Sequence, residues 1–448
     1  MCMSNLLNPV IVAVVLLCVL CLLKINVMLS MLISLFVAGI IGGLPVVSSG
    51  DEASIMSSVI AGFSNNAETA LAYVLLGTLA SCMATTGITE ILSKKLSKVI
   101  GGNKWIMILA LLIIACLSQN LIPIHIAYIP ILVPPLLVLM NKMKLDRRGV
   151  ACTIAFGHKA PYIAIPFGFG AIFMGIIADN INANVKSDWG WEKVSISQIT
   201  SVNWVLAVAM LIGLAIAIFI SYRKPREYQD IQIEGTHEMT DLRLKWEHYV
   251  ILAALVVVVV LQFIFGSLPV AALGGLVIIF LFRGIKLSDI DEQFQGGVKL
   301  MGFIAFVMLV AGGFATVLQN TGAVDSLVSS AIDLMGGNKW IAATIITLIG
   351  LLVTMGIGTS FGTVPVLAVL YVPLCYQMGF SPAATIVLMS AAAALGDAGS
   401  PASDTTLGPT SGLNADGQHD HIWDTCVPTF LHFNIPLMIA AIVAAQFL

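Results

Sequence analysis

Apolar stretches long enough to cross a membrane recur along the whole sequence, and they restrict its possible folds more than any other feature. A spanning helix needs about 18 or more predominantly apolar residues. Only 10% of the 448 residues are charged, whereas about 25% are charged in an ordinary soluble domain. We therefore expect an all-α polytopic membrane protein. The main candidate spans are 8–23, 28–47, 69–84, 203–220, 250–265, 301–318 and 425–448.

The sequence also contains an internal repeat. The pentapeptide GGNKW occurs at 101–105 and again at 336–340, an offset of 235 residues. The same offset aligns further glycine, threonine and acidic positions, and after a four-residue insertion Gly157 aligns with Gly396. Agreement over so many positions indicates two homologous halves. The predicted domains are repeat 1 at 8–222, a linker at 223–247 and repeat 2 at 248–448.

The number of membrane crossings in each half predicts how the repeats are related. We assign four spans and one broken span to each half, and a hairpin that returns to its own side. An odd number of crossings requires inverted-topology repeats. We expect about 10 transmembrane helices and two re-entrant hairpins, although two full spans in place of each hairpin would preserve the parity. The hairpins are 104–141, with its tip at 118–123, and 339–378, with its tip at 356–362.

The basic residues in the loops indicate the orientation. This arrangement places 17 of the 21 Lys and Arg residues on one side, in the loops at 24, 93–104, 141–148, 223–247 and 283–300. Lys186, Lys193 and Lys339 fall on the other side, and Lys159 lies inside a span. Cytoplasmic loops carry the excess of positive charge. We therefore predict a multi-pass protein of the cell inner membrane with a cytoplasmic linker and both termini outside.

One broken span in each half combines proline and glycine with polar residues: FGHKAPYIAIPFGFG at 156–170 and LGDAGSPASDTTLGPTSG at 395–412. Irregular backbone at membrane depth is tolerated only where it is buried in protein or lines a watery cavity. Interrupted segments at matching positions of two inverted halves are the best sequence indication of a transport site. We therefore expect the site where these two segments meet.

The second broken span contains oxygen ligands suited to Na+ or to a proton. A carboxylate at the bilayer centre costs at least about 2.5 kcal/mol, so its presence indicates function or a partner. In the alternative interpretation, Asp397, Ser403 and Asp404 only cap the second half-helix. The predicted ion-binding residues are Asp397, Ser400, Ser403, Asp404, Thr405 and Thr406, with Asn120, Thr359 and Ser360 from the hairpin tips.

The first broken span has His158 and Lys159 where the second has Asp397. Two basic side chains could hold a substrate carboxylate, or one of them could pair with Asp397 and neutralise the core. The polar groups at the hairpin tips either complete a binding shell or only close the turns. The predicted substrate-binding residues are Ser118, Gln119, Asn120, His158, Lys159 and Asp397.

The remaining polar residues favour no other cofactor. The stretch DGQHDHIWD at 416–424 contains metal-ligand types, but we interpret it as a solvated loop rather than a metal site. The eight cysteines fall mostly in apolar stretches, which is typical of buried small side chains. No basic or Gly-rich motif indicates nucleic acid. The expected partners are a small-molecule substrate, a monovalent cation, membrane lipid and a second copy in a possible homodimer.

The string GDAGSPASDTT at 396–406, followed by DHIWDT at 420–425, resembles the pattern of the NhaC-type Na+/H+ antiporter superfamily within the ion transporter folds. The pattern of the whole chain is similar to the YuiF-like branch, whose members have been proposed to carry amino acids, histidine in particular. The resemblance implies cation-coupled alternating access. It also implies that the ion region lies in the second broken span.

Three functions are compatible with the residues. A cation-coupled amino acid transporter accounts for opposite charges at one site, whereas a Na+/H+ antiporter without an organic substrate leaves His158 and Lys159 as neutralising groups. An intramembrane aspartyl protease is suggested by ALGD at 394–397. We disfavour this enzyme because Ala394 replaces the first glycine of the protease signature, and no second membrane-embedded aspartate lies on a different helix.

Overall fold

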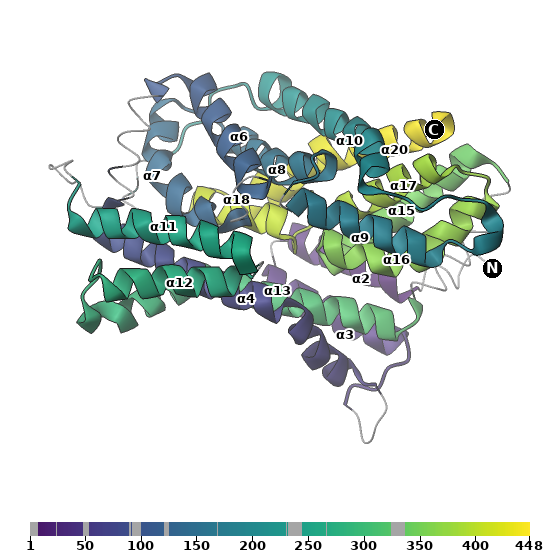
Figure 1. Ribbon diagram of the computed structural model, residues 1–448, viewed down its shortest axis with the longest axis horizontal. Helices are drawn as coiled ribbons and strands as arrows, with labels where there is room; N and C mark the ends of the chain where they lie inside the picture. Colours follow the sequence, from purple (N-terminus) through teal and green to yellow (C-terminus); the bar gives the residue numbers. More distant parts are fainter. Residues whose placement is uncertain are drawn as a thin grey trace.

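The computed structural model describes residues 8–23, 25–47, 53–88, 91, 100–120, 125–167, 169–229, 231, 244–265, 267–323 and 337–448. These residues form helices and connecting loops, with no strand among them (Figure 1). The helices of the first half are α2 (Pro9–Leu22), α3 (Val27–Ile41), α4 (Ile55–Thr86), α6 (Lys104–Asn120), η1 (His125–Tyr128), α7 (Ile129–Lys142), α8 (Arg147–Ala164), α9 (Phe169–Asn184), η2 (Ser187–Trp189), α10 (Ile196–Ile216) and η3 (Ala217–Ser221).

The second half repeats this order of long helices. Its elements are α11 (Trp246–Phe265), α12 (Leu268–Leu281), η4 (Leu287–Asp289), α13 (Ile290–Asn320), α15 (Lys339–Ile357), α16 (Ser360–Gln377), α17 (Pro382–Ala394), α18 (Asp404–Leu413), η5 (His421–Cys426), α19 (Val427–Thr429), η6 (Phe430–Asn434) and α20 (Ile435–Phe447). The predicted all-helical membrane fold is therefore confirmed.

Within the described residues, three helices are long and apolar enough to cross a membrane, or up to five if each bent pair is one span. The three are Ile196–Ser221, Lys339–Gly356 and His421–Phe447. The bent pairs are Arg147–Ala164 with Phe169–Asn184, at 51°, and Leu287–Phe303 with Ala305–Asn320, at 47°. Several other apolar helices have 10–17 residues. The number of about 10 transmembrane helices remains a prediction.

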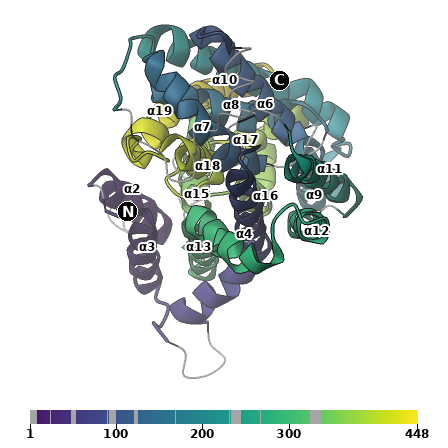
Figure 2. The same cartoon turned by 90° about the vertical axis from the view of Figure 1, so that its left-hand side faces the viewer.

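The two longest helices, α4 and α13, pack side by side (Figures 1 and 2), and glycines lie at their contact. A Cβ added at Gly62 would lie 2.4 Å from the carbonyl oxygen of Gly312, and one added at Gly77 would lie 2.6 Å from that of Gly297. Because the contacts advance along one helix and retreat along the other, the helices run antiparallel. The 235-residue offset relates Gly62 to Gly297 and Gly77 to Gly312. The two glycine contacts are therefore equivalent under the repeat.

Polar contacts between α4 and α13 follow the same pattern. The Asn320 amide donates to the Ser58 hydroxyl at 2.8 Å, and the Thr85 hydroxyl donates to Gln293 Oε1 at 3.0 Å. The offset that aligns the glycines also aligns Ser58 with Gln293 and Thr85 with Asn320. A contact that recurs between repeat-related positions is the property of an interface around a two-fold axis.

The broken span of each half packs against the hairpin of the other half. Helix α9 packs on α16 of the second hairpin, and α18 packs on α7 of the first. The second hairpin turns at Gly358, whose φ of +74° is a left-handed conformation that glycine adopts readily. The two breaks, at 165–168 and 395–403, lie inside the two predicted segments. The helix that follows each break thus packs against the hairpin of the other half.

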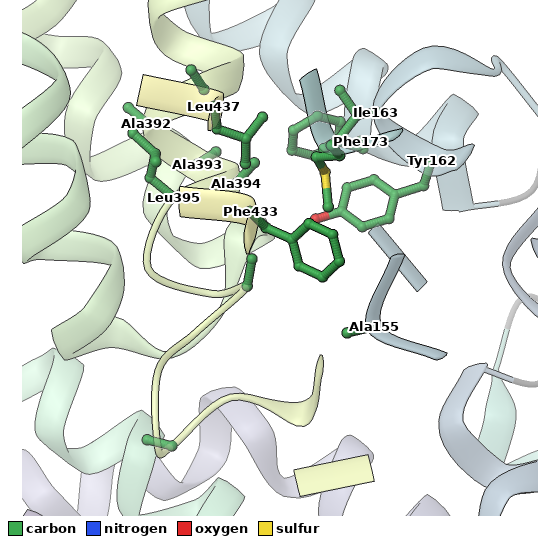
Figure 3. Packing of buried hydrophobic residues seen from close by; sticks show 14 of the residues in the cluster. Ala155, Tyr162, Ile163, Phe173, Ala392, Ala393, Ala394, Leu395, Phe433 and Leu437 are labelled. Atoms are coloured by element: carbon green, nitrogen blue, oxygen red, sulfur yellow. The ribbon is translucent and has the colours of Figure 1, made fainter. Parts of the chain in front are cut away.

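Small side chains allow close packing around the second break. A Cβ added at Gly350 of α15 would lie 2.4 Å from the Cβ of Ala392 in α17. Close approach between small residues stabilises helix pairs in membranes through van der Waals contact. Figure 3 shows the alanines at the end of α17 with Leu437 on one side of this core, and Tyr162, Ile163 and Phe173 on the other.

Candidate transport site

The second broken span leaves nine residues, 395–403, outside helix between α17 and α18. Its hydroxyls satisfy carbonyl groups within the break. The Ser403 hydroxyl donates to the Asp397 carbonyl, and the Thr406 hydroxyl donates to that of Ser400, both at 2.5 Å. Ser400 in turn donates to the carbonyl of Met355 at 3.1 Å. These bonds involve Asp397 only through its backbone carbonyl, and its carboxylate remains available to side chains of other helices.

The carboxylate of Asp397 accepts hydrogen bonds from three elements and is 2% exposed. It pairs with the Lys159 ammonium of α8. It also accepts from the backbone amide of Ser360 at 3.2 Å, at the N-terminus of α16, where a helix dipole favours negative charge. The Ser360 hydroxyl donates to the same oxygen, and Thr405 of α18 donates to the other at 3.2 Å.

The Lys159 ammonium is equally buried and makes two further hydrogen bonds. It donates to the Tyr162 hydroxyl at 2.7 Å and to the Ser360 hydroxyl at 2.9 Å. The hydroxyls of Tyr162 and Ser360 are themselves 2.7 Å apart. Of the sequence alternatives, the geometry matches the one in which a basic residue neutralises Asp397. Such a pair is electrically balanced, but each charge has lost its hydration.

Asp404 lies at the start of α18 and is partly exposed, and one of its carboxylate oxygens accepts from the Thr405 hydroxyl at 3.3 Å. Ser403 occupies the N-cap position without a side-chain cap bond, because its hydroxyl binds Asp397 instead. Tyr73 of α4 was not a predicted site residue. Its buried hydroxyl makes no hydrogen bond to the described residues. Tyr73 is therefore a buried oxygen without a partner among those residues.

The remaining predicted residues of repeat 1 lie around the first break. The Asn120 amide donates to the carbonyl oxygens of Ile165 and Phe167 at 3.0 and 2.9 Å. The ring of His158 contacts the hydroxyl of Tyr128 at 3.0 Å. Asn120 thus satisfies carbonyls at the end of α8, and it is Lys159 rather than His158 that pairs with Asp397.

The other hairpin-tip residues make mostly local contacts. The Ser118 hydroxyl donates to the carbonyl of Ala115 at 2.7 Å within α6, and Gln119 is buried. Thr359 precedes α16, and its carbonyl accepts from the Thr363 hydroxyl at 2.7 Å. Of the five predicted tip residues, Ser360 is therefore the one whose described contacts join the Asp397 cluster.

Asn434 is a further residue that the sequence interpretation missed. Its side chain is 1% exposed, and neither its oxygen nor its nitrogen has a hydrogen-bond partner among the described residues. A Cβ added at Gly399 would lie 3.1 Å from its Nδ2 atom, so the amide faces the second break. An unpaired buried amide costs about 1–3 kcal/mol. Asn434 also ends a π-helical turn, η6, and such turns are frequent at functional sites.

The stretch 416–424 is partly solvated: Gly417, Asp420 and Trp423 are exposed, whereas His419 and Asp424 are buried. Asp416 pairs with the fully buried Arg147 through two hydrogen bonds of 2.6 and 2.5 Å, and Asp424 pairs with Arg226 of the linker at 2.6 Å. No group of three or more metal-ligand side chains occurs in the described part of the chain. Asp416 and Asp424 therefore bind arginines, whereas Asp420 caps η5 by accepting from the backbone amides of Ile422 and Trp423. The arginine partners could not be inferred from a single sequence.

Burial and the arginines shift the pKa values in this stretch. Burial raises the pKa of the Asp416 carboxyl, but the hydrogen bonds from Arg147 outweigh this effect, so the pKa lies below its usual value. Burial lowers the pKa of His419 to about 3, so its ring is neutral at pH 7. The loop after α18 is thus held to α8 by an ion pair that persists at neutral pH.

In this multi-pass helical membrane protein, buried Lys159 of one interrupted helix meets buried Asp397 of the other. Its relatives show that it is a secondary transporter and not an enzyme. Comparison with known proteins gives the family. Residues 153–444 match the Na+/H+ antiporter family and residues 8–100 match a second family described as Na+-H+ antiporter. The chain belongs to the Na+/H+ antiporter family.

Related sequences extend over nearly the whole chain. An uncharacterized membrane protein of Vibrio parahaemolyticus, VP2115, is 45% identical over 98% of this chain and 100% of its own length. YuiF of Bacillus subtilis, described as a proposed amino acid transporter, is 44% identical over 86% of this chain and 88% of its own length. The solved structure of MtrF from Neisseria gonorrhoeae, titled as one of a class of antimetabolite efflux pumps, covers 94% of both chains with a TM-score of 0.45 and 14% identity.

Proposed function

We propose that this protein is a Na+- or H+-coupled secondary transporter of an amino acid, such as histidine, and that it works by alternating access. The observation that carries the proposal is the buried Lys159–Asp397 pair between the two broken helices. The 44% identity to YuiF supports an amino acid as the substrate class. The family supports Na+ or H+ as the coupling ion.

A zwitterion can replace this ion pair without leaving net charge in the core. Its ammonium group would take the place of Lys159 at the Asp397 carboxylate, and its carboxylate would take the place of Asp397 at the Lys159 ammonium. The hydroxyls of Tyr162 and Ser360 already bind one or both charged groups and would bind the incoming ones. A buried charge that loses its partner is costly, so exchange of one balanced pair for another favours a zwitterion over a simple anion.

The coupling cation has oxygen ligands beside the same pair. Asp397 and Asp404 both accept from the Thr405 hydroxyl, at 3.2 and 3.3 Å. Carboxylate, hydroxyl and carbonyl oxygens are hard ligands of the kind that suit small hard cations. We propose that a Na+ ion or a proton binds here. Its positive charge would compensate a carboxylate while the Lys159 ammonium binds the substrate. His158 and Asn120 support the opposite break in this proposal.

We further propose that the repeats are inverted and that the linker side is cytoplasmic. Loops assigned to one side contact one another: Trp189 stacks on Tyr376 with ring centres 4.2 Å apart, and Lys339 donates to the Gly379 carbonyl on that side. On the other side Arg226 meets Asp424. The antiparallel crossing of the repeat-related helices α4 and α13 supports an axis in the membrane plane.

Cysteine labelling tests this topology. On a cysteine-free background, a cysteine replacing the exposed Ser187 should react with an impermeant maleimide in intact cells. A cysteine replacing the exposed Ser288 should react only after permeabilisation, because it lies in a predicted cytoplasmic loop. Labelling of position 288 in intact cells would contradict the inverted arrangement.

Binding of an amino acid panel tests the substrate class. The purified protein should bind at least one amino acid saturably, measured by scintillation proximity. The Lys159→Met variant should bind it about 10–100-fold more weakly, because one hydrogen bond to a charged group contributes about 1.5–3 kcal/mol. Lys186→Met, at an exposed position, is the control. If no amino acid binds while Na+/H+ exchange is intact, the protein is the antiporter without an organic substrate.

A further inference from the structure

A basic depression lies at the surface on the predicted cytoplasmic side, away from the Asp397 cluster. It contains about 410 Å³ of empty space open to solvent, between the start of α6, the turn before α8 and the end of η3. Four basic side chains line it: Lys104, Lys144, Arg223 and Lys224. Neither the ion pair at Asp397 nor the contacts of 416–424 use these groups.

Most of this positive charge is uncompensated by protein. The acidic group in the lining, Asp146, is already bound by Arg148 through bonds of 2.7 and 3.1 Å. Lys144 pairs with Glu227, but both side chains are exposed. Among the described residues, no carboxylate lies within ion-pair distance of Lys104, Arg223 or Lys224. The depression therefore favours an anion.

Aromatic residues form the apolar side of the depression. Trp105 lines it and stacks on Phe219, with ring centres 5.2 Å apart, and the Lys104 ammonium lies 5.0 Å from the centre of the Trp105 ring. Tryptophan is enriched at the boundary between membrane and water. This arrangement places the cations where headgroups of a bilayer would lie.

An exposed apolar track continues from the depression along two helices. On α6 the exposed residues Trp105, Leu109 and Ile113 follow one another at intervals of four, which places them on one face. On α10 and η3 the exposed residues are Ile212, Ile216 and Phe219. A free phosphate would use only the basic end, whereas a phospholipid uses both the basic end and the track.

We propose that this depression is a binding site for an anionic phospholipid, with the phosphate held by Lys104, Arg223 and Lys224 and the acyl chains lying along α6 and α10. Basic pockets between membrane helices on the cytoplasmic side are suited to such headgroups. The site joins α6, in the first hairpin, to the start of the linker between the repeats. A bound lipid therefore contacts both segments at once.

Native mass spectrometry of the full-length protein with vesicle lipids tests the proposal. Wild-type protein should retain phosphatidylglycerol at least tenfold better than phosphatidylcholine. The variant Arg223→Gln/Lys224→Gln should lose about tenfold or more of that preference. Each basic residue near a membrane surface strengthens the attraction to anionic lipid, and this variant removes two of them. The matched control, Lys186→Gln/Lys193→Gln, removes two exposed cations on the opposite predicted side and should keep it.

Three results would overturn the proposal. Equal retention of both lipids by wild-type protein would exclude a headgroup site. Equal losses in the two double variants would mean that the attraction follows net charge rather than the depression. Competition by inorganic phosphate as effective as that of phosphatidylglycerol would identify a phosphate site without a role for the apolar track.

Discussion

The Asp397→Asn variant should lose gradient-driven transport and unfold at a lower temperature. The substitution leaves the buried Lys159 ammonium without its counter-charge, and breaking a buried pair by removing one partner costs about 3–5 kcal/mol. Transport fails for a separate reason, because neither the coupling cation nor a substrate ammonium retains its carboxylate. Uptake into proteoliposomes and thermal unfolding would measure the two effects. Asp188→Asn, at an exposed position, should change neither.

A double variant separates charge balance from transport. In Asp397→Asn/Lys159→Met no uncompensated charge remains, and a buried pair can often be replaced by uncharged groups at little cost in stability. We therefore expect the unfolding temperature to return most of the way toward that of the wild type, while transport stays absent. Transport by the double variant with unchanged cation dependence would mean that the pair only neutralises the core.

The Arg147→Gln variant should be among the least stable. Arg147 is fully buried and binds Asp416 through both terminal nitrogens, with further bonds to the Leu413 carbonyl and to Asn141. Its removal leaves a carboxylate and a carbonyl without their partner, so we expect a loss of about 3–5 kcal/mol in thermal unfolding at pH 7. Lys144→Gln, which breaks the exposed pair with Glu227, should have little effect.

The pH dependence of this contribution has a definite sign. The pKa of Asp416 is lowered in the folded protein, so its pair with Arg147 stabilises the fold fully above the unfolded carboxyl pKa of about 3.9. The stabilisation is lost as the pH falls through the lower folded value. Without Arg147, burial raises the pKa of the Asp416 carboxyl in the folded variant, so the variant recovers stability when this carboxyl is protonated. The difference in stability between wild type and Arg147→Gln should therefore be largest at pH 7 to 8 and shrink as the pH falls. A difference that grew on acidification would contradict the assignment.

The positions of the breaks could be predicted because proline and glycine are conspicuous in an apolar chain. Pro166 and Pro401 lie in the two breaks and remove backbone donors where no water can replace them. That constraint indicated both broken segments and the polar residues within them. The neutralising partner of Asp397 was also among the alternatives, because an isolated carboxylate inside a membrane requires compensation.

The residues that complete the site could not be identified in the same way. Tyr73 and Asn434 lie in otherwise ordinary helical sequence, and their surroundings depend on which helix packs against which. Tyr162 lies inside the first broken segment, where the residues in contact with it still depend on the packing. Tyr162 follows Lys159 by one helical turn, so its position on the same face was predictable, but its contact with Ser360 of the second half was not. The burial of Arg147 likewise depends on a loop 269 residues away.

Uptake of radiolabelled histidine into proteoliposomes under imposed gradients is the most direct test of exchange at the Lys159–Asp397 pair. We predict saturable, concentrative uptake that requires a Na+ or H+ gradient, is abolished by an ionophore that collapses that gradient, and is absent from Asp397→Asn. A panel of other amino acids should include competitors that share the α-ammonium and α-carboxylate groups. Na+/H+ exchange by the wild-type protein without flux of any amino acid would contradict the account.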